Sequence, residues 1–201
     1  MRNLLTIALL IPSLATAQRG GSAPFGARTD STSKPVLLTP ARVWTAVEDA
    51  PHEGWVVLVR GDRIEAVGPR GDVTVPADAT TIALPSTTLV PGLFEGHSHL
   101  LLHPYNETSW NDQVLHEDLA LRVVRAVNHA KAALMAGFTS SRDLGTEGAG
   151  YADVGLRDAI NQGLTPGPRM QVVTKAIVVT GQYAPKGFAT EYADERGRSR
   201  K

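Results

Sequence analysis

The sequence predicts an α/β protein in which a small all-β unit precedes the first β/α units of a parallel fold. Short apolar runs separated by turn residues recur between residues 36 and 90. From Pro91 to Val173 the order becomes strand, helix, strand, helix, strand, which is typical of a parallel α/β sheet. The composition agrees with a folded core, because 42% of the 201 residues are hydrophobic.

The N-terminal residues 1–17 have the layout of a secretory signal peptide. Arg2 is positively charged, residues 4–10 are almost entirely apolar, and Ala15-Thr16-Ala17 is a small-residue cleavage site. The apolar stretch is about half of the roughly 20 residues that a bilayer span requires. We therefore expect cleavage before Gln18, no membrane span afterwards, and an exported protein, periplasmic or secreted. Residues 18–34, rich in Gly, Ser, Thr and Pro, are expected to form a flexible leader.

Residues 35–90 are expected to form the all-β unit. Two apolar segments, 55–59 and 63–67, flank Gly61-Asp62, a pair that suits a tight two-residue hairpin turn. Shorter apolar runs before and after this hairpin predict further strands. Many unrelated domains begin with such a sheet, so this unit by itself indicates no function.

Residues 91–190 are expected to form the parallel part, and residues 191–201 a polar, basic tail. A helix is predicted after residue 116 from apolar residues at spacings of three and four, with Arg122 outside the apolar stripe. Gly137 is placed to end this helix in a left-handed conformation. A second strand from Phe138, a helix over 151–162 and a third strand over 170–173 follow. The apolar stripe of the first helix consists of Leu119, Val123, Val127, Ala130 and Leu134.

Two histidines stand at the end of the first strand of this parallel part. His97 and His99 are separated by one residue, and residues i and i+2 of a strand point to the same side. Their imidazoles can therefore reach one metal ion. A His-x-His pair alone also occurs by chance on surfaces, so the pair gains its meaning from its place at the carboxyl end of a parallel strand, where the active sites of β/α barrels lie.

Composition excludes several other kinds of site. Cysteine is absent, so a disulfide framework, a thiolate metal site and a cysteine nucleophile are all excluded. The 20 basic residues balance the 20 acidic residues, which gives no electrostatic reason to expect nucleic acid as a partner.

The segment from Leu89 to Leu100, LVPGLFEGHSHL, resembles the metal-dependent amidohydrolase superfamily. Gly137-Phe138-Thr139 with Arg142-Asp143 is similar to the second-strand segment of that family, and Gly167-Pro168-Arg169 to its third-strand entry. The resemblance covers about residues 36–188. It is strongest toward exported imidazolonepropionase-like and Xaa-Pro dipeptidase-like amidohydrolases.

This resemblance implies a small β-sandwich portion followed by an incomplete (β/α)₈ TIM-like barrel. It also implies one or two divalent metal ions, commonly zinc, and hydrolysis of a carbon–nitrogen bond in a small cyclic amide or dipeptide. His97 and His99 match the family's first metal ligands. Glu95 stands where the family usually has Asp, so we place it among the second-shell or substrate-loop candidates together with His103 and Asp143.

The remaining metal ligands of the family come from later strands and are not found in this sequence. From Pro91 onward there are 111 residues, whereas a complete barrel takes about 250. We therefore expect an N-terminal fragment with no hydrolase activity of its own. The alternative is a non-catalytic exported β/α module that acts through self-association or a partner.

Overall fold

The computed structural model describes residues 33–178. The predicted signal peptide, the leader up to residue 32, residues 179–190 and the predicted tail lie outside the described residues. The chain divides into two compact units between Leu89 and Val90.

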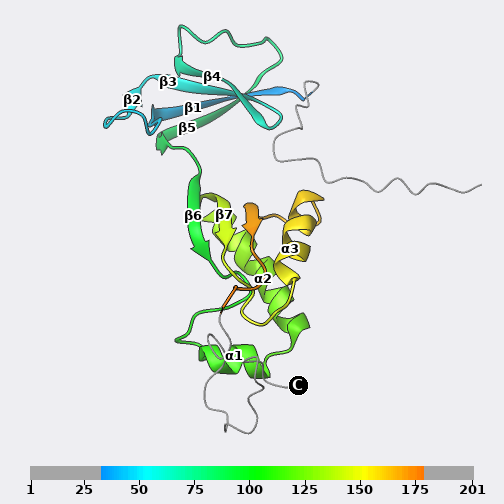
Figure 1. Cartoon of the computed structure of the whole chain (residues 1–201). Coiled ribbons are helices and arrows are strands. Elements are labelled where there is room, and N and C mark those ends of the chain that lie inside the picture. The colour runs from blue at the N-terminus through cyan, green and yellow to red at the C-terminus, as the bar shows by residue number, and fades with distance from the viewer. Residues whose placement is uncertain (1–32, 179–201) are drawn as a thin grey trace, which may run out of the picture. The chain divides into compact units, whose positions relative to one another are not determined.

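The first unit is a five-stranded sheet (Figure 1). Antiparallel pairing gives the order β2-β1-β3-β4, and β5 pairs with β1 in parallel. The strands are β1 (Pro35–Val43), β2 (His52–Glu53), β3 (Trp55–Arg60), β4 (Arg63–Pro69) and β5 (Thr80–Leu89).

The hairpin predicted around Gly61-Asp62 is confirmed. Arg60 pairs with Arg63 across a two-residue turn, and Gly61 has a positive φ of 55°, which favours glycine at that position. One face of the sheet is apolar because alternate residues of β1 and β3 point to the same side. Leu37 and Leu58 form its centre, at 1% and 3% exposure.

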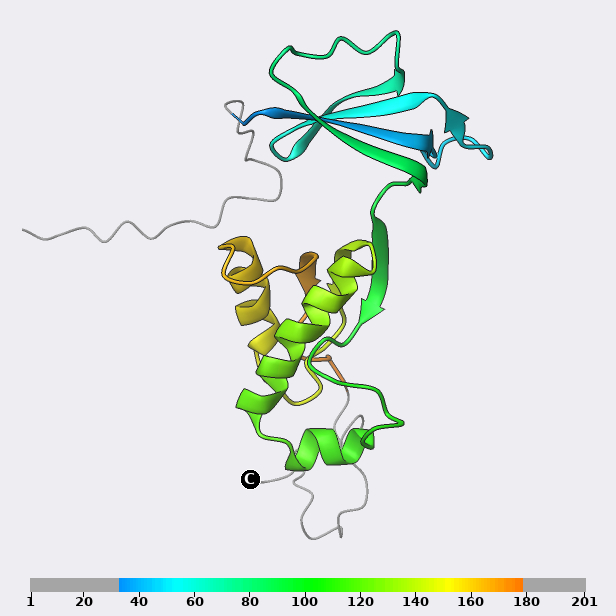
Figure 2. The ribbon, with the colours of Figure 1, turned by 180° about the vertical axis from the view of Figure 1, so that it is seen from behind.

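The second unit is a three-stranded parallel sheet in the order β6-β7-β8, with helices between its strands (Figure 2). Helix α2 packs on β7, and α3 packs on β8 and on α2. The elements are β6 (Leu93–Ser98), α1 (Trp110–His116), α2 (Leu119–Met135), β7 (Phe138–Asp143), α3 (Ala152–Asn161) and β8 (Arg169–Val172). The predicted α/β class and the predicted parallel order are therefore confirmed.

The predicted apolar stripe of α2 is only partly correct. Ala126 and Ala130 are fully buried, but Leu119 at the start of the helix is 53% exposed. Arg122, expected outside the stripe, is buried at 3% exposure. Its guanidinium donates to backbone carbonyls of two loops, so hydrogen bonding compensates for burying the charge. The buried face of α2 is therefore rotated toward Arg122.

Helix ends follow the local sequence. The Asp118 carboxylate accepts a hydrogen bond from the Ala120 N–H at 2.8 Å and caps the start of α2. Gly137 follows the last turn with a φ of 97°, as its position predicts. Helix α1 was not predicted, because its seven residues lack an apolar period and precede the helix predicted after residue 116. Among residues 33–178, no helix is long and apolar enough to cross a bilayer.

Candidate metal site

The two histidines of the His-x-His segment come together at the carboxyl end of β6. His97 is the penultimate residue of the strand and His99 follows its last residue. The two Nε2 atoms are 3.3 Å apart, and the rings meet at an interplanar angle of 64°. The exposed His97 and the partly buried His99 thus direct the same ring atom toward one point.

This separation fits a shared metal ion. Two zinc–nitrogen bonds of about 2.0–2.1 Å at a tetrahedral angle place their nitrogens about 3.4 Å apart. Within residues 33–178, no cluster of three or more His, Cys, Asp or Glu side chains could hold a metal. The described part of the chain therefore offers a pair of ligands, and a catalytic zinc usually takes three protein ligands.

The orientation of His99 is set from the loop that follows β7. His99 Nδ1 lies 3.0 Å from the carbonyl oxygen of Gly145. A carbonyl only accepts, so Nδ1 carries the proton and Nε2 keeps its lone pair. This is the tautomer that metal coordination through Nε2 requires, and such backbone partners commonly orient ligating histidines. Glu147 Oε1 is 3.6 Å from the same Nδ1 atom.

Asp143, the last residue of β7, links the two strand ends. It is fully buried, and its carboxylate accepts from the Leu100 N–H at 2.7 Å and from the Gly145 N–H at 3.3 Å. Leu100 follows His99, and the Gly145 carbonyl contacts the His99 ring, so Asp143 holds both the backbone after this histidine and the loop that orients its ring. Burial raises the pKa of Asp143, and the two backbone hydrogen bonds oppose this only in part.

The Glu95 carboxylate contacts the backbone of the strand end that carries the histidine pair. Its Oε1 accepts from the N–H of His97 at 2.9 Å. A carboxylate bonded to the N–H two residues along the chain stabilises the turn of the strand end that carries His97. The structure thus places Glu95 beside the histidine pair, in contact with the backbone.

His103 belongs to a separate group of charged side chains in the loop after β6. Its Nδ1 lies 3.0 Å from Glu107 and its Nε2 2.8 Å from Glu117. Arg125 of α2 contacts the same carboxylate of Glu117 at 2.6 Å. Burial acts to raise the pKa of Glu117, but the hydrogen bonds from His103 and Arg125 outweigh it and hold that pKa below its usual value. His103 is therefore engaged in holding this loop.

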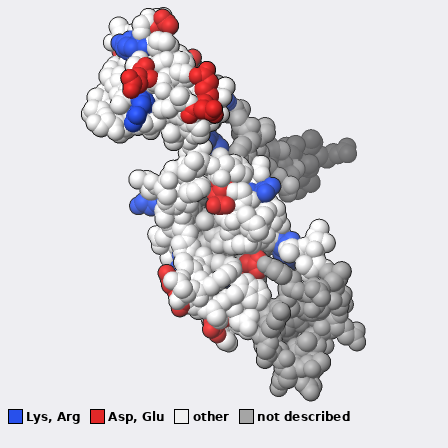
Figure 3. All heavy atoms as spheres, turned by 90° about the vertical axis from the view of Figure 1, so that its left-hand side faces the viewer, with Lys and Arg blue, Asp and Glu red and all other residues white. Residues whose placement is uncertain are grey.

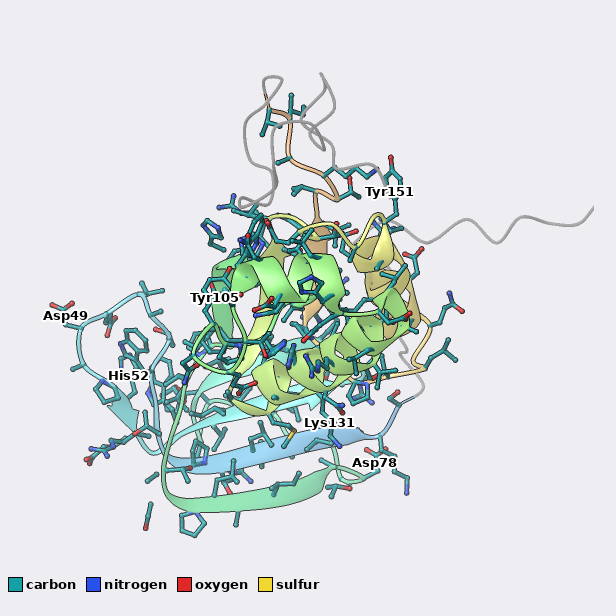
Figure 4. The ribbon with its side chains drawn as sticks, turned by 90° about the horizontal axis from the view of Figure 1, so that it is seen from below. Asp49, His52, Asp78, Tyr105, Lys131 and Tyr151 are labelled. Atoms are coloured by element: carbon teal, nitrogen blue, oxygen red, sulfur yellow. The ribbon has the colours of Figure 1, made fainter. Side chains whose placement is uncertain are left out.

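A cavity of about 290 Å³ is lined by His103 and by His99, one member of the histidine pair. Its walls are mostly apolar, with three histidine rings among them. Tyr105, labelled in Figure 4, comes from the loop between β6 and α1 and is 60% exposed. The cavity is lined by His99, Leu100, Leu102, His103, Pro104, Tyr105 and His129.

Arg122 and Glu147, which lie next to the histidine pair or its loops, were not predicted from the sequence to belong to the site. Arg122 donates to the carbonyls of Leu101, Thr146 and Glu147 at 2.9–3.1 Å and so joins the loops that follow β6 and β7. The Glu147 side chain is 4% exposed. The only local signal is the glycine-rich segment 144–150, in which Gly145, Gly148 and Gly150 have positive φ. Such density of glycine after a parallel strand indicates a tight loop near a site.

Comparison with known proteins shows which solved structures this fold resembles. No protein-family model and no curated protein sequence matches the chain. Solved structures do match, and they include amidohydrolase-family structures, namely dipeptidases, prolidases and amidohydrolases. The resemblance to amidohydrolases that the sequence predicts is thereby confirmed.

Three solved structures illustrate the match. A prolidase complexed with N-methylphosphonate-L-proline is 30% identical, with a TM-score of 0.60 over 74% of this chain and 34% of its own. An amidohydrolase is 27% identical, with a TM-score of 0.60 over 83% of this chain and 35% of its own. A Xaa-Pro dipeptidase with bound methionine is 23% identical, with a TM-score of 0.61 over 74% of this chain and 35% of its own. At this identity the match supports the fold alone. The chain spans about a third of the length of these structures.

Proposed function

We propose that this chain is the N-terminal part of a metal-dependent hydrolase that acts on carbon–nitrogen bonds of small amides, cyclic amides or dipeptides. The observation that carries the proposal is the 3.3 Å approach of His97 Nε2 and His99 Nε2 at the end of a parallel strand. The similarity to a prolidase and an amidohydrolase at 30% and 27% identity supports the same reaction class. None of the comparisons supports the alternative of a non-catalytic module.

In this proposal β6, β7 and β8 are the first three strands of a (β/α)₈ barrel, and the first unit is part of a small β-sandwich. His97 and His99 hold a divalent metal, with zinc the commonest choice for imidazole ligands in hydrolases. The chemistry expected from the bound metal is Lewis-acid activation of a water molecule and stabilisation of charge on the scissile carbonyl. Further ligands come from later barrel strands. The signal peptide exports the protein to the periplasm or the medium.

The chain's own residues have defined tasks in this proposal. The Gly145 carbonyl holds the His99 tautomer, and Asp143 fixes the backbone around it. The apolar cavity next to His99 is open to a nonpolar substrate group, since most of its lining is Leu, Pro and Tyr. We expect small-molecule substrates of this kind and neither nucleic acid nor a membrane span in the mature protein.

The decisive experiment measures metal binding in the protein that carries the complete barrel. His97→Ala and His99→Ala should each weaken zinc or cobalt binding more than the roughly 10–100-fold that loss of a second-shell partner costs. Both should abolish hydrolysis of Xaa-Pro dipeptides and cyclic amides. The matched control is His116→Ala, because the His116 side chain is 71% exposed and its partner within residues 33–178 is Asp112, in a surface ion pair.

Two results would contradict the proposal. Metal affinity that stays unchanged in both ligand variants would remove the metal site. Equal loss of affinity in His116→Ala would show that the effect is not specific to the strand-end pair.

A further inference from the structure

We propose that Glu147 is a positioning residue for His99. Its carboxylate helps to hold the His99 imidazole in the orientation and tautomer that present Nε2 to the metal. This inference rests on the proposed metal site. It assigns a task to a residue on a different strand-end loop from the histidines, one that the sequence motif does not include.

The contact itself is an electrostatic one. Two acceptors face Nδ1 of His99, the Gly145 carbonyl at 3.0 Å and Glu147 Oε1 at 3.6 Å. The distance to Glu147 exceeds a hydrogen bond, but its side chain is 4% exposed, so little water screens the interaction. A negative charge beside the Nδ1 proton favours the tautomer with that proton in place and makes Nε2 a stronger donor to a metal.

Glu147 is itself held from three directions. Its Oε2 accepts from the indole N–H of Trp110 at 3.1 Å. Its carbonyl oxygen accepts from the buried guanidinium of Arg122 at 3.0 Å. Its backbone has a φ of 50°, a left-handed conformation that is uncommon for residues other than glycine. Such a conformation persists only where the surroundings enforce it, and these positions concentrate at functional sites.

Other nearby carboxylates have different partners. Glu107 and Glu117 contact His103, and Asp143 is bonded to backbone N–H groups. Asp143 also interacts electrostatically with His99, but among the described residues Glu147 is the carboxylate that lies within 4 Å of a ring nitrogen of His99. Glu107 therefore serves as a matched control: it is a glutamate of the second unit that pairs with a histidine, and its side chain is 61% exposed.

The test compares Glu147→Ala, Glu147→Gln and Glu107→Gln in the complete protein. One readout is the tautomer of His99 in the metal-free protein, from nitrogen-15 NMR at a pH where the imidazole is neutral. The other is the dissociation constant for zinc or cobalt. In Glu147→Ala the Gly145 carbonyl still accepts from Nδ1, so we expect a smaller fraction of the Nδ1–H tautomer than in the wild type, together with roughly 10–100-fold weaker metal binding. Glu147→Gln keeps the size of the side chain but removes the charge on which the contact rests, so it should resemble Glu147→Ala in both readouts. Glu107→Gln should change neither readout.

The outcomes separate this inference from the metal site. The proposed role of Glu147 would be wrong if folded Glu147→Ala kept the wild-type tautomer of His99 and the wild-type metal affinity. A lower melting temperature would not rescue the proposal, because a purely structural residue changes the melting temperature alone. If the wild type binds no metal, the proposed function fails, while the tautomer measurement still decides the role of Glu147. If Glu147→Ala does not fold, Trp110→Phe removes the indole N–H that donates to Glu147 and should shift the tautomer and the affinity in the same direction by a smaller amount.

Discussion

The two units bury different kinds of atoms. Each has a hydrophobic core, centred on Leu37 in the first unit and on Ala126 and Ala130 in the second. The buried polar and charged residues among those described all belong to the second unit. They are His103, Gln113, Arg122, Ser141, Asp143, Thr146, Glu147 and Asp153.

Surface charge shows a complementary difference. On the face drawn in Figure 3, the first unit carries acidic and basic side chains close together, whereas the second unit shows wide uncharged areas. In the first unit, strand pairing satisfies the backbone and charged side chains stay in solvent. In the second unit, buried side chains satisfy the backbone of loops, as when Gln113 bonds both the N–H and the carbonyl of His103 at 2.9 Å.

Buried polar side chains fix the geometry of the loops in the second unit. Loops normally lie on the surface because their backbone groups need water. The loops after β6 and β7 are instead held by Arg122 and Asp143, which replace that water with directed hydrogen bonds. Buried hydrogen bonds of this kind rigidify the residues that they contact, and here these include Leu100 and Gly145, the neighbours of His99.

The largest expected effect comes from removing the arginine at the centre of the second unit. Arg122→Met should lower the free energy of unfolding by about 4 kcal/mol, because three buried carbonyls would lose their donor at about 1–3 kcal/mol each. Urea denaturation measures this. The matched change in the first unit is Arg60→Met, which removes a partly exposed ion pair with Glu65 and should cost about 0.2–1 kcal/mol. Equal costs for the two variants would show that the comparison between the units is wrong.

The next effect tests the apolar core of the first unit. Leu37→Ala should lower the free energy of unfolding by about 3 kcal/mol, since Leu37 is 1% exposed and leaves a cavity when truncated. The hydrophobic residues that pack in the same cluster as Leu37 all belong to the first unit. Metal affinity, measured at a temperature where the protein is folded, should therefore not change. Calorimetry and metal titration measure the two quantities. A loss of metal affinity in Leu37→Ala would show that the site depends on the first unit.

The smallest effect concerns pH and two carboxyl groups of the second unit. Burial raises the pKa of Asp143 above its ordinary value of 3.8, so the folded protein holds this proton more tightly than the unfolded chain. The resulting stabilisation is complete below the unfolded pKa and is lost as pH rises through the folded pKa. The stability of the wild type relative to Asp143→Asn should therefore fall as pH rises above about 3.8.

Glu117→Gln provides a control of opposite sign. The pKa of Glu117 is held below its ordinary value of 4.5, so its stabilisation is present above the unfolded pKa and is lost as pH falls through the folded pKa. The stability of the wild type relative to Glu117→Gln should rise with pH in the window below 4.5. Urea denaturation from pH 3 to 7 measures both differences. Parallel slopes for the two variants would contradict the opposite environments of these groups.

Much of the fold was predictable because it depends on short-range patterns. The hairpin at Gly61-Asp62 and the end of α2 at Gly137 each follow from a residue that tolerates positive φ. The parallel order of β6, β7 and β8 follows from alternating strand and helix periods. Parallel pairing of β5 with β1 was not predicted, because strand partners distant in sequence carry no local signal.

The sequence by itself also determined that His97 and His99 share one side of a strand end, because a strand repeats every two residues. Only the tertiary structure decided what surrounds them. Asp143 bonds the Leu100 N–H next to His99, and Glu147 lies beside the His99 ring, because β7 pairs with β6 and brings together residues more than forty positions apart. The burial of Arg122 depends likewise on two loops that supply three carbonyls to one guanidinium. Burying a charge is favourable only where hydrogen bonds replace those of water. A charged helix residue is therefore predicted to face solvent unless such partners are known.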